Sequence, residues 1–173
     1  MGEAGVLTED DRVELLEGVI TPKMVHNPPH DGVIMQLEER LRPLLPPGWA
    51  IRLQSSLTTS DSEPEPDLAI VRGGARDYFQ RHPGPADVGL VVEVADSSLM
   101  RDRKKARLYS RAGLVIYWIV NLVDGQIEVN SQPTGPVDAP EYRQTAVHRR
   151  GDLIPFVVEE VPVGTLLVDD LLP

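Results

Sequence analysis

Two almost uninterrupted apolar runs stand in the middle of the chain. The first, GLVVEVA, covers residues 89–95, and the second, LVIYWIVNL, covers residues 114–122. Runs of this length and composition are typical of central strands that are covered on both faces. The segment between them, residues 99–112, is basic and ends at Gly113, which predicts a helix. One helix that joins two buried strands favours a mixed β-sheet with helices packed against it.

Shorter patterns predict the other elements. Apolar positions at helical spacing predict a helix from about residue 30 to residue 45. Acidic residues followed by apolar ones predict a short helix between Thr8 and Gly18, and another short helix is expected in the tail, residues 163–172. Strands are expected over residues 19–25, 49–57, 68–71, 126–130, 141–148 and 153–158. This order predicts one α/β domain over residues 1–173, with a mixed central β-sheet flanked by helices.

The composition narrows the class of function. The 173 residues carry 17 Lys and Arg against 27 Asp and Glu, which gives a formal net charge of −10 and a pI of about 4.8. Such an acidic chain is no general binder of polyanions, because affinity for nucleic acid rests largely on cations that replace phosphate counterions. A role on nucleic acid would need a local basic strip, a metal or an oligomer. The absence of cysteine excludes disulfides and thiolate metal sites.

The expected location is the cytoplasm. The N-terminal segment shows no basic stretch followed by an apolar one, so no signal peptide is expected. The longest apolar stretch, around residues 114–120, is far shorter than the roughly 20 residues that a membrane-spanning helix needs. We therefore expect no membrane partner.

Two acidic residues stand where the hydrophobic pattern does not favour them. Asp67 follows Pro66 directly ahead of a short apolar run, and Glu93 interrupts the first central strand. A lone carboxylate in a dry core is costly unless it is paired, protonated or bound to a metal. If the two strands are neighbours, the carboxylates converge and offer two hard oxygen donors, which suit Mg²⁺ or Mn²⁺. On the residues alone, a turn role for Asp67 and an ion pair for Glu93 stay open.

The segment after Glu93 supplies a local basic strip. Six Lys and Arg residues lie between residues 101 and 111 of an otherwise acidic chain. A lysine beside a metal can orient a water molecule or stabilise charge that develops on a phosphate. On sequence alone Lys104 and Lys105 are equal candidates, and either could lie on a solvated helix face.

At these residues the chain resembles the Uma2 group of restriction-endonuclease-like proteins, within the PD-(D/E)xK nuclease superfamily. The resemblance rests on VELLEGVI at residues 13–20, on NPPHDGVIMQLEERL at residues 27–41 and, most specifically, on the block from Pro66 to Trp118. It implies a restriction-endonuclease-like core and Mg²⁺- or Mn²⁺-dependent hydrolysis of phosphodiester bonds. Nucleic acid, with DNA as the expected substrate, would be the partner. A homodimer is expected because single-cut nucleases of this size often pair.

The resemblance also implies metal ligands. Asp67 would be the first metal-binding aspartate and Glu93 the second acidic ligand, with the backbone carbonyl of Val94 or Ala95 completing the set. Glu14 would be an extra carboxylate, carried by the predicted N-terminal helix and directed at the site.

A third catalytic residue follows from the same resemblance. The lysine that the superfamily usually carries two residues after the second acid is absent, because position 95 is alanine. In this group a lysine on the following helix substitutes, and the Asp-x-x-Lys-x-x-x-Tyr spacing from Asp102 to Tyr109 places it at Lys105. The expected catalytic residues are therefore Asp67, Glu93 and Lys105.

Two other functions stay open. The fold can persist as a catalytically inactive interaction or assembly module, which the acidic surface and the missing lysine favour. A ligand-binding domain would instead use the cleft without chemistry and without divalent ions.

The histidines give little reason to expect a metal role. His30 is expected to cap or pack at a helix start. His26 stands four residues before it, but two prolines lie between them, so no helix is expected to hold the pair together.

Overall fold

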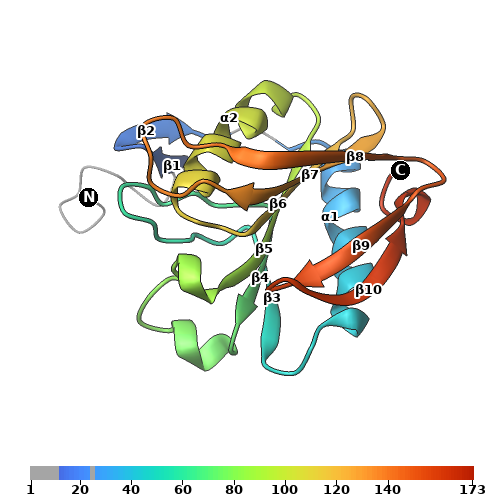
Figure 1. Cartoon of the computed structure of the whole chain (residues 1–173), viewed down its shortest axis with the longest axis horizontal. Helices are drawn as coiled ribbons and strands as arrows, with labels where there is room; N and C mark the ends of the chain where they lie inside the picture. The colour runs from blue at the N-terminus through green and yellow to red at the C-terminus, as the bar shows by residue number, and fades with distance from the viewer. Residues whose placement is uncertain (1–11, 24–25) are drawn as a thin grey trace.

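A six-stranded mixed sheet forms the centre of the molecule (Figure 1). The computed structural model describes residues 12–23 and 26–173 of the chain. The strands follow the order β3-β4-β5-β6-β7-β8, in which β5 and β6 run parallel and the other neighbouring pairs antiparallel. Their bounds are β3 (Trp49–Leu53), β4 (Leu68–Arg72), β5 (Val88–Ala95), β6 (Ile116–Asn121), β7 (Gln126–Pro133) and β8 (Tyr142–Arg149). The predicted mixed sheet of the α/β class is confirmed.

Two helices, α1 (Pro28–Leu41) and α2 (Leu99–Arg111), flank this sheet. Successive side chains of a strand point to opposite faces, so β5 sends Leu90 to the hydrophobic cluster that includes α1 and Val91 to the cluster that includes α2. Glu93 lies two residues after Val91 and therefore points to the same face, the one that α2 covers. In the part of the chain that the structure describes, no helix is long and apolar enough to cross a membrane.

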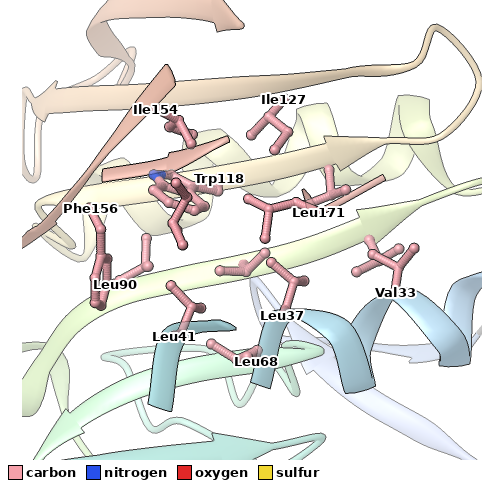
Figure 2. Close-up of a cluster of buried hydrophobic side chains, with 14 of the residues drawn as sticks. Val33, Leu37, Leu41, Leu68, Leu90, Trp118, Ile127, Ile154, Phe156 and Leu171 are labelled. Carbon is pink, nitrogen blue, oxygen red and sulfur yellow. The ribbon is translucent and has the colours of Figure 1, made fainter. Parts of the chain in front are cut away.

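The larger hydrophobic cluster lies between α1, the central sheet and a second, two-stranded sheet (Figure 2). That second sheet pairs β9 (Leu153–Val158) with β10 (Val161–Leu167), and its Phe156 ring meets Trp118 edge-on, with ring centroids 6.4 Å apart. Burial of each such side chain stabilises the fold by about 1.5–3 kcal/mol. The cluster thus fixes α1 on the sheet. The helix contributes its apolar stripe, Val33, Ile34, Leu37 and Leu41.

The first described element is a hairpin, so the helix predicted to end at Gly18 is wrong over these residues. β1 (Val13–Leu16) pairs antiparallel with β2 (Val19–Pro22). Glu17 and Gly18 join the strands with positive φ angles of 50° and 77°, as a two-residue hairpin turn requires. A glycine can end a helix or close a hairpin, so the sequence alone does not decide between them. The strand forms because the backbone N–H of Glu63, in a distant loop, donates a hydrogen bond to the carbonyl of Leu15 in β1. Residues 8–11 of the predicted helix lie outside the described part.

The tail also differs from the prediction. Residues 163–167 belong to strand β10, and only a short 3₁₀ turn, Val168–Asp170, follows. Glu159 and Glu160 make the turn between β9 and β10 with φ angles of 50° and 65°. Nothing in a pair of glutamates favours this left-handed conformation, so the hairpin depends on the packing of β9 against the core.

The start of α1 lies two residues earlier than the sequence predicts. Asn27 caps the helix, because its side-chain oxygen accepts a hydrogen bond from the backbone N–H of His30 at 3.1 Å. Pro28 and Pro29 occupy the first turn, where a missing N–H costs nothing. The two prolines therefore begin the helix and do not separate it from the residues that precede it.

Candidate functional site

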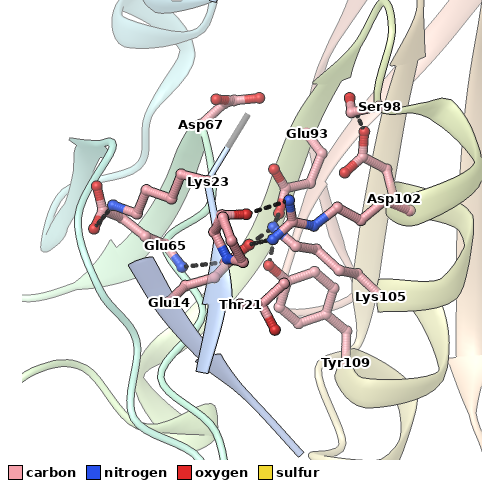
Figure 3. A network of polar contacts seen from close by, with 12 residues as sticks. Glu14, Thr21, Lys23, Glu65, Asp67, Glu93, Ser98, Asp102, Lys105 and Tyr109 are labelled. Carbon is pink, nitrogen blue, oxygen red and sulfur yellow. Dashed lines mark hydrogen bonds and ion pairs between the residues drawn. The ribbon is translucent and has the colours of Figure 1, made fainter. Parts of the chain in front are cut away.

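A polar cavity of about 90 Å³ lies beside the central sheet. Its walls come from the β1–β2 hairpin, the N-terminal ends of α1 and α2, the start of β4 and the end of β5 (Figure 3). All the expected site residues line it: Glu14, Asp67, Glu93, Val94 and Lys105. The sequence therefore locates the cavity, and the structure adds the contacts within it.

Asp67 and Glu93 reach the cavity because β4 and β5 are antiparallel neighbours. Leu68 lies opposite Val92, so the residue before β4 and a residue near the end of β5 meet at one edge. Asp67 is 7% exposed, and its Oδ2 accepts a hydrogen bond from the backbone N–H of Val94 at 2.7 Å. This bond fixes the carboxylate against β5, which a solvent-facing turn residue would not need.

Glu93 is almost completely buried, and its Oε1 is held by two donors. Lys105 Nζ donates to it at 3.0 Å and the Tyr109 hydroxyl at 2.8 Å. Burial raises the pKa of Glu93, while the Lys105 ammonium opposes that rise. The paired ammonium is what makes a carboxylate tolerable in this strand.

Of the two candidate lysines of α2, Lys105 lines the cavity and Lys104 does not. The Lys105 side chain is buried, whereas Lys104 is exposed on the outer face of α2. Burial would lower the pKa of Lys105, but the carboxylates of Glu93 and Glu14 outweigh it and hold that pKa above its usual range. Lys105 therefore keeps its proton.

Glu14 lies at the site on a strand, not on a helix. Its Oε1 accepts a hydrogen bond from Arg101 at 2.8 Å. Its Oε2 pairs with Lys105 Nζ at 3.1 Å and accepts the backbone N–H of Glu65 at 3.3 Å. Because both oxygens already contact cationic or N–H groups, Glu14 holds the two basic side chains of α2 in place.

Asp102 is a further buried acid in the cavity wall. The Ser98 hydroxyl donates to its Oδ2 at 2.5 Å, and burial raises the pKa of Asp102 to about 6. It stands one helical turn before Lys105, so the two side chains lie on the same face of α2.

Two histidines at the mouth of the cavity are functional candidates that the sequence pattern does not reveal. His30 Nε2 lies 3.2 Å from Asp67 Oδ2, and the His26 ring stacks on the His30 ring with centroids 4.1 Å apart. Burial would lower the pKa of His30, but its hydrogen bonds to Asp67 and Asp31 outweigh this and raise it. Burial and the neighbouring His30 lower the pKa of His26. The sequence HNPPH contains the relevant cue, since prolines suit the first helical turn.

The two acids retain donor atoms suited to a divalent cation. Among the described residues, no hydrogen bond reaches the second oxygen of Asp67, Oδ1, or of Glu93, Oε2. Carboxylate and carbonyl oxygens are the donors that Mg²⁺ and Mn²⁺ prefer. The residues therefore fit such an ion chemically. Position 95, where the superfamily lysine would stand, is a fully buried alanine packed with α2.

Comparison with known proteins agrees with this geometry. The model of the Uma2 family, described as "Putative restriction endonuclease", matches residues 4–161. The structure is similar to the crystal structure of a putative nuclease belonging to DUF820 from Anabaena variabilis, with a TM-score of 0.69 and 14% sequence identity. That match covers 98% of this chain and 94% of the other. No curated protein matches. The likeness shows the fold, and the restriction-endonuclease-like core is confirmed.

Proposed function

Because the chain belongs to the Uma2 family, we propose that it is a metal-dependent endonuclease that hydrolyses phosphodiester bonds in DNA. The observation that carries this proposal is the meeting of two buried carboxylates and one buried ammonium group, from Asp67, Glu93 and Lys105, in one cavity. Three such groups are costly to bury unless they serve a purpose there.

Asp67 and Glu93 would hold the metal, Mg²⁺ or Mn²⁺, together with the backbone carbonyl of Val94. When bound, the ion would supply a water of lowered pKa and would stabilise negative charge on the phosphate. Glu14 has both oxygens engaged by Arg101, Lys105 and a backbone N–H, which favours a positioning role over direct ligation.

Lys105 would act on the phosphate through its remaining donor. An ammonium group has three N–H bonds, and those of Lys105 meet Glu93 and Glu14 in two directions. The third can donate to a phosphate oxygen or to the attacking water inside the cavity. Because the Glu93 and Glu14 carboxylates hold its pKa above the usual range, Lys105 would stabilise charge in its protonated form.

The charges around the cavity favour a divalent cation when a phosphate approaches. The lining side chains include six carboxylates, from Glu14, Glu65, Asp67, Glu93, Asp96 and Asp102, against four Lys and Arg. The formal excess is two negative charges, which one divalent ion neutralises. Without it, the cavity would repel a phosphate.

A groove beside the cavity offers a path for the nucleic acid strand. It has a volume of about 630 Å³ and runs between the β1–β2 hairpin and α2. Arg101 and Lys105 line both the groove and the cavity, and Lys104 adds a further cation to the groove. Lys104, which is exposed, can contact a backbone phosphate beside the scissile bond.

We further propose that the whole chain forms one restriction-endonuclease-like domain and acts as a homodimer. A dimer would present two such cavities, one for each strand of a duplex. Light scattering would then give a mass twice the 19.1 kDa of the chain, whereas a mass of 19.1 kDa at all concentrations would exclude the dimer.

The test is thermal denaturation of the wild type, Asp67→Asn and Glu93→Gln, each with EDTA, Mg²⁺ or Mn²⁺. A metal that binds the folded state stabilises it by about 2.7 kcal/mol at a hundredfold excess over its Kd, which raises Tm by roughly 5–10 °C for a chain of this size. We expect this rise in the wild type and in the control His82→Gln, whose side chain is exposed. Neither acid variant should show it.

A nuclease assay on DNA and RNA substrates completes the test. We expect Mg²⁺- or Mn²⁺-dependent cleavage of DNA by the wild type and loss of cleavage in both acid variants. Absence of a Tm rise at millimolar metal, together with absence of cleavage, would overturn the proposal and favour the interaction module.

A further inference from the structure

A second group of metal-ligating side chains lies at the N-terminal end of α1. One ligand atom from each of His26, His30 and Asp31 lies within 4.8 Å of the other two. Asp31 Oδ1 is 3.5 Å from His26 Nδ1 and 3.4 Å from His30 Nδ1. In a tetrahedral site with bonds of about 2.0–2.2 Å, two ligand atoms are about 3.3–3.5 Å apart. The two distances from Asp31 to the histidines therefore match four-coordinate geometry.

An independent contact orients His30 for this role. Its Nε2 lies 3.2 Å from Asp67 Oδ2, and in the neutral ring that donates an N–H from Nε2 to that carboxylate the lone pair lies on Nδ1. Metal-binding histidines commonly donate their other N–H to a carboxylate, which fixes the tautomer and the ring orientation. His30 is only 7% exposed, and its stacking on His26 holds both rings at the same place.

We propose that His26, His30 and Asp31 form a binding site for a transition-metal ion such as Zn²⁺ at the mouth of the cavity, separate from the Asp67–Glu93 acids. Two imidazole nitrogens and one carboxylate suit Zn²⁺ or Co²⁺, whereas Mg²⁺ prefers oxygen donors alone. Three protein ligands leave a fourth position for water or for a substrate oxygen.

The side chains next to these three residues can make room for a metal ion to bind. Gln54 Nε2 lies 3.0 Å from His26 Nδ1, so this side chain must turn aside or offer its amide oxygen when a metal binds. The Asp31 side chain is 61% exposed, so its replacement does not disturb the core. The site stands on these contacts and does not depend on nuclease activity.

The experiment is a titration of the metal-free protein with Co²⁺, followed by its visible absorption and by calorimetry. We expect one tetrahedral Co²⁺ per chain, which Zn²⁺ displaces. His26→Gln and Asp31→Asn should each raise the Kd for Co²⁺ by at least about tenfold, the effect of losing even an outer partner of a metal ligand. Glu93→Gln and the control His82→Gln should bind Co²⁺ as the wild type does.

Circular dichroism in EDTA confirms that each variant is folded, and the surface position of Asp31 provides a variant that keeps its fold. Unchanged Co²⁺ affinity in both ligand variants, or no tetrahedral spectrum in the wild type, would overturn the proposal. Loss of Co²⁺ binding in Glu93→Gln would place the ion at the acids instead. A Mg²⁺-dependent Tm rise that survives His26→Gln separates this site from the proposed nuclease centre.

Discussion

Lys105 is the cation that two buried carboxylates of the cavity, Glu14 and Glu93, share. Its ammonium group lies 3.0 Å from Glu93 and 3.1 Å from Glu14, and all three side chains are buried. Removal of the lysine would leave two buried carboxylates without their shared cation. Removing one partner of a buried ion pair costs far more than the pair contributes, because the remaining charge stays desolvated.

We expect Lys105→Met to lower the free energy of unfolding by about 3–5 kcal/mol. Urea denaturation at neutral pH measures this change in the free energy of unfolding. The neighbouring Lys104→Met is the matched control, since Lys104 is exposed and should change stability by no more than about 0.5 kcal/mol. Equal effects of the two substitutions would mean that the buried contacts of Lys105 carry no stability. Adding Glu93→Gln to Lys105→Met should restore part of the loss.

The buried Asp102 predicts how the stability of the protein depends on pH. Burial raises its pKa from 3.8 to about 6, so between these values the folded state binds more protons than the unfolded state. Wild-type stability should therefore fall as pH rises from 4 to 7, relative to Asp102→Asn, which does not titrate there. The difference should change by up to about 3 kcal/mol, at about 1.4 kcal/mol for each unit of pKa shift.

Chemical denaturation of both proteins in EDTA, at several pH values, measures this difference. Loss of the Ser98 hydrogen bond would add a constant offset, and only a slope in the stated direction supports the raised pKa. A flat difference would mean that Asp102 ionises in the folded protein as readily as in the unfolded chain.

The central residues of the cavity could be predicted from the sequence, and the histidines around them could not. Asp67 and Glu93 stand out because each conflicts with its local pattern, whereas Lys105 is distinguished from Lys104 only by the spacing of the family that the chain resembles. The contact between His30 and Asp67 could not be predicted, because the two residues are 37 positions apart in the sequence. Only the packing of α1 on the sheet brings them together. No local pattern encodes such a contact.

At Gly89, strand β5 packs closely against β3 and the β9–β10 sheet. A Cβ atom at Gly89 would lie 2.8 Å from the Trp49 ring and 2.9 Å from a Val158 methyl group. We expect Gly89→Ala to destabilise the protein by about 1–3 kcal/mol through overpacking. Gly32→Ala, in the exposed face of α1 with nothing within 4 Å, should stabilise it by about 0.5–1 kcal/mol.

Paired thermal and urea denaturation of the two glycine variants measures this contrast. A neutral Gly89→Ala would show that the second sheet can move away from β5 without loss. The opposite sign in Gly32→Ala excludes a general effect of replacing glycine by alanine.

The elements that the sequence predicts correctly have a clear local pattern. Helix α1 follows from apolar residues at helical spacing, α2 from a basic segment that ends at a glycine, and the two central strands β5 and β6 from their apolar runs. The sequence predicts helices where strands β1 and β10 form, and the hairpins that contain these strands turn through residues with positive φ, three of them glutamates. That conformation is imposed by tertiary pairing, and the glutamate side chain gives no sign of it.

Over the whole molecule, the sequence predicts the architecture and leaves the charge distribution unexplained until the chain is folded. A net charge of −10 disfavours nucleic acid as a partner. Five of the six basic residues of α2 form ion pairs with carboxylates, and Lys104 is exposed at the groove; the five are Arg101, Arg103, Lys105, Arg107 and Arg111. Binding of the proposed substrate to this acidic molecule would therefore depend on a divalent cation more than on unpaired basic residues.

The position of Lys105 on α2 also affects how related sequences can be recognised. In this fold the amino group reaches Glu93 from a helix twelve residues downstream, and strand β5 carries only alanine at position 95. A search pattern that demands acid and lysine two residues apart would pass over this chain. One that allows the lysine a helix turn beyond a later acid, Asp102, with the tyrosine, Tyr109, one turn further, would retrieve it.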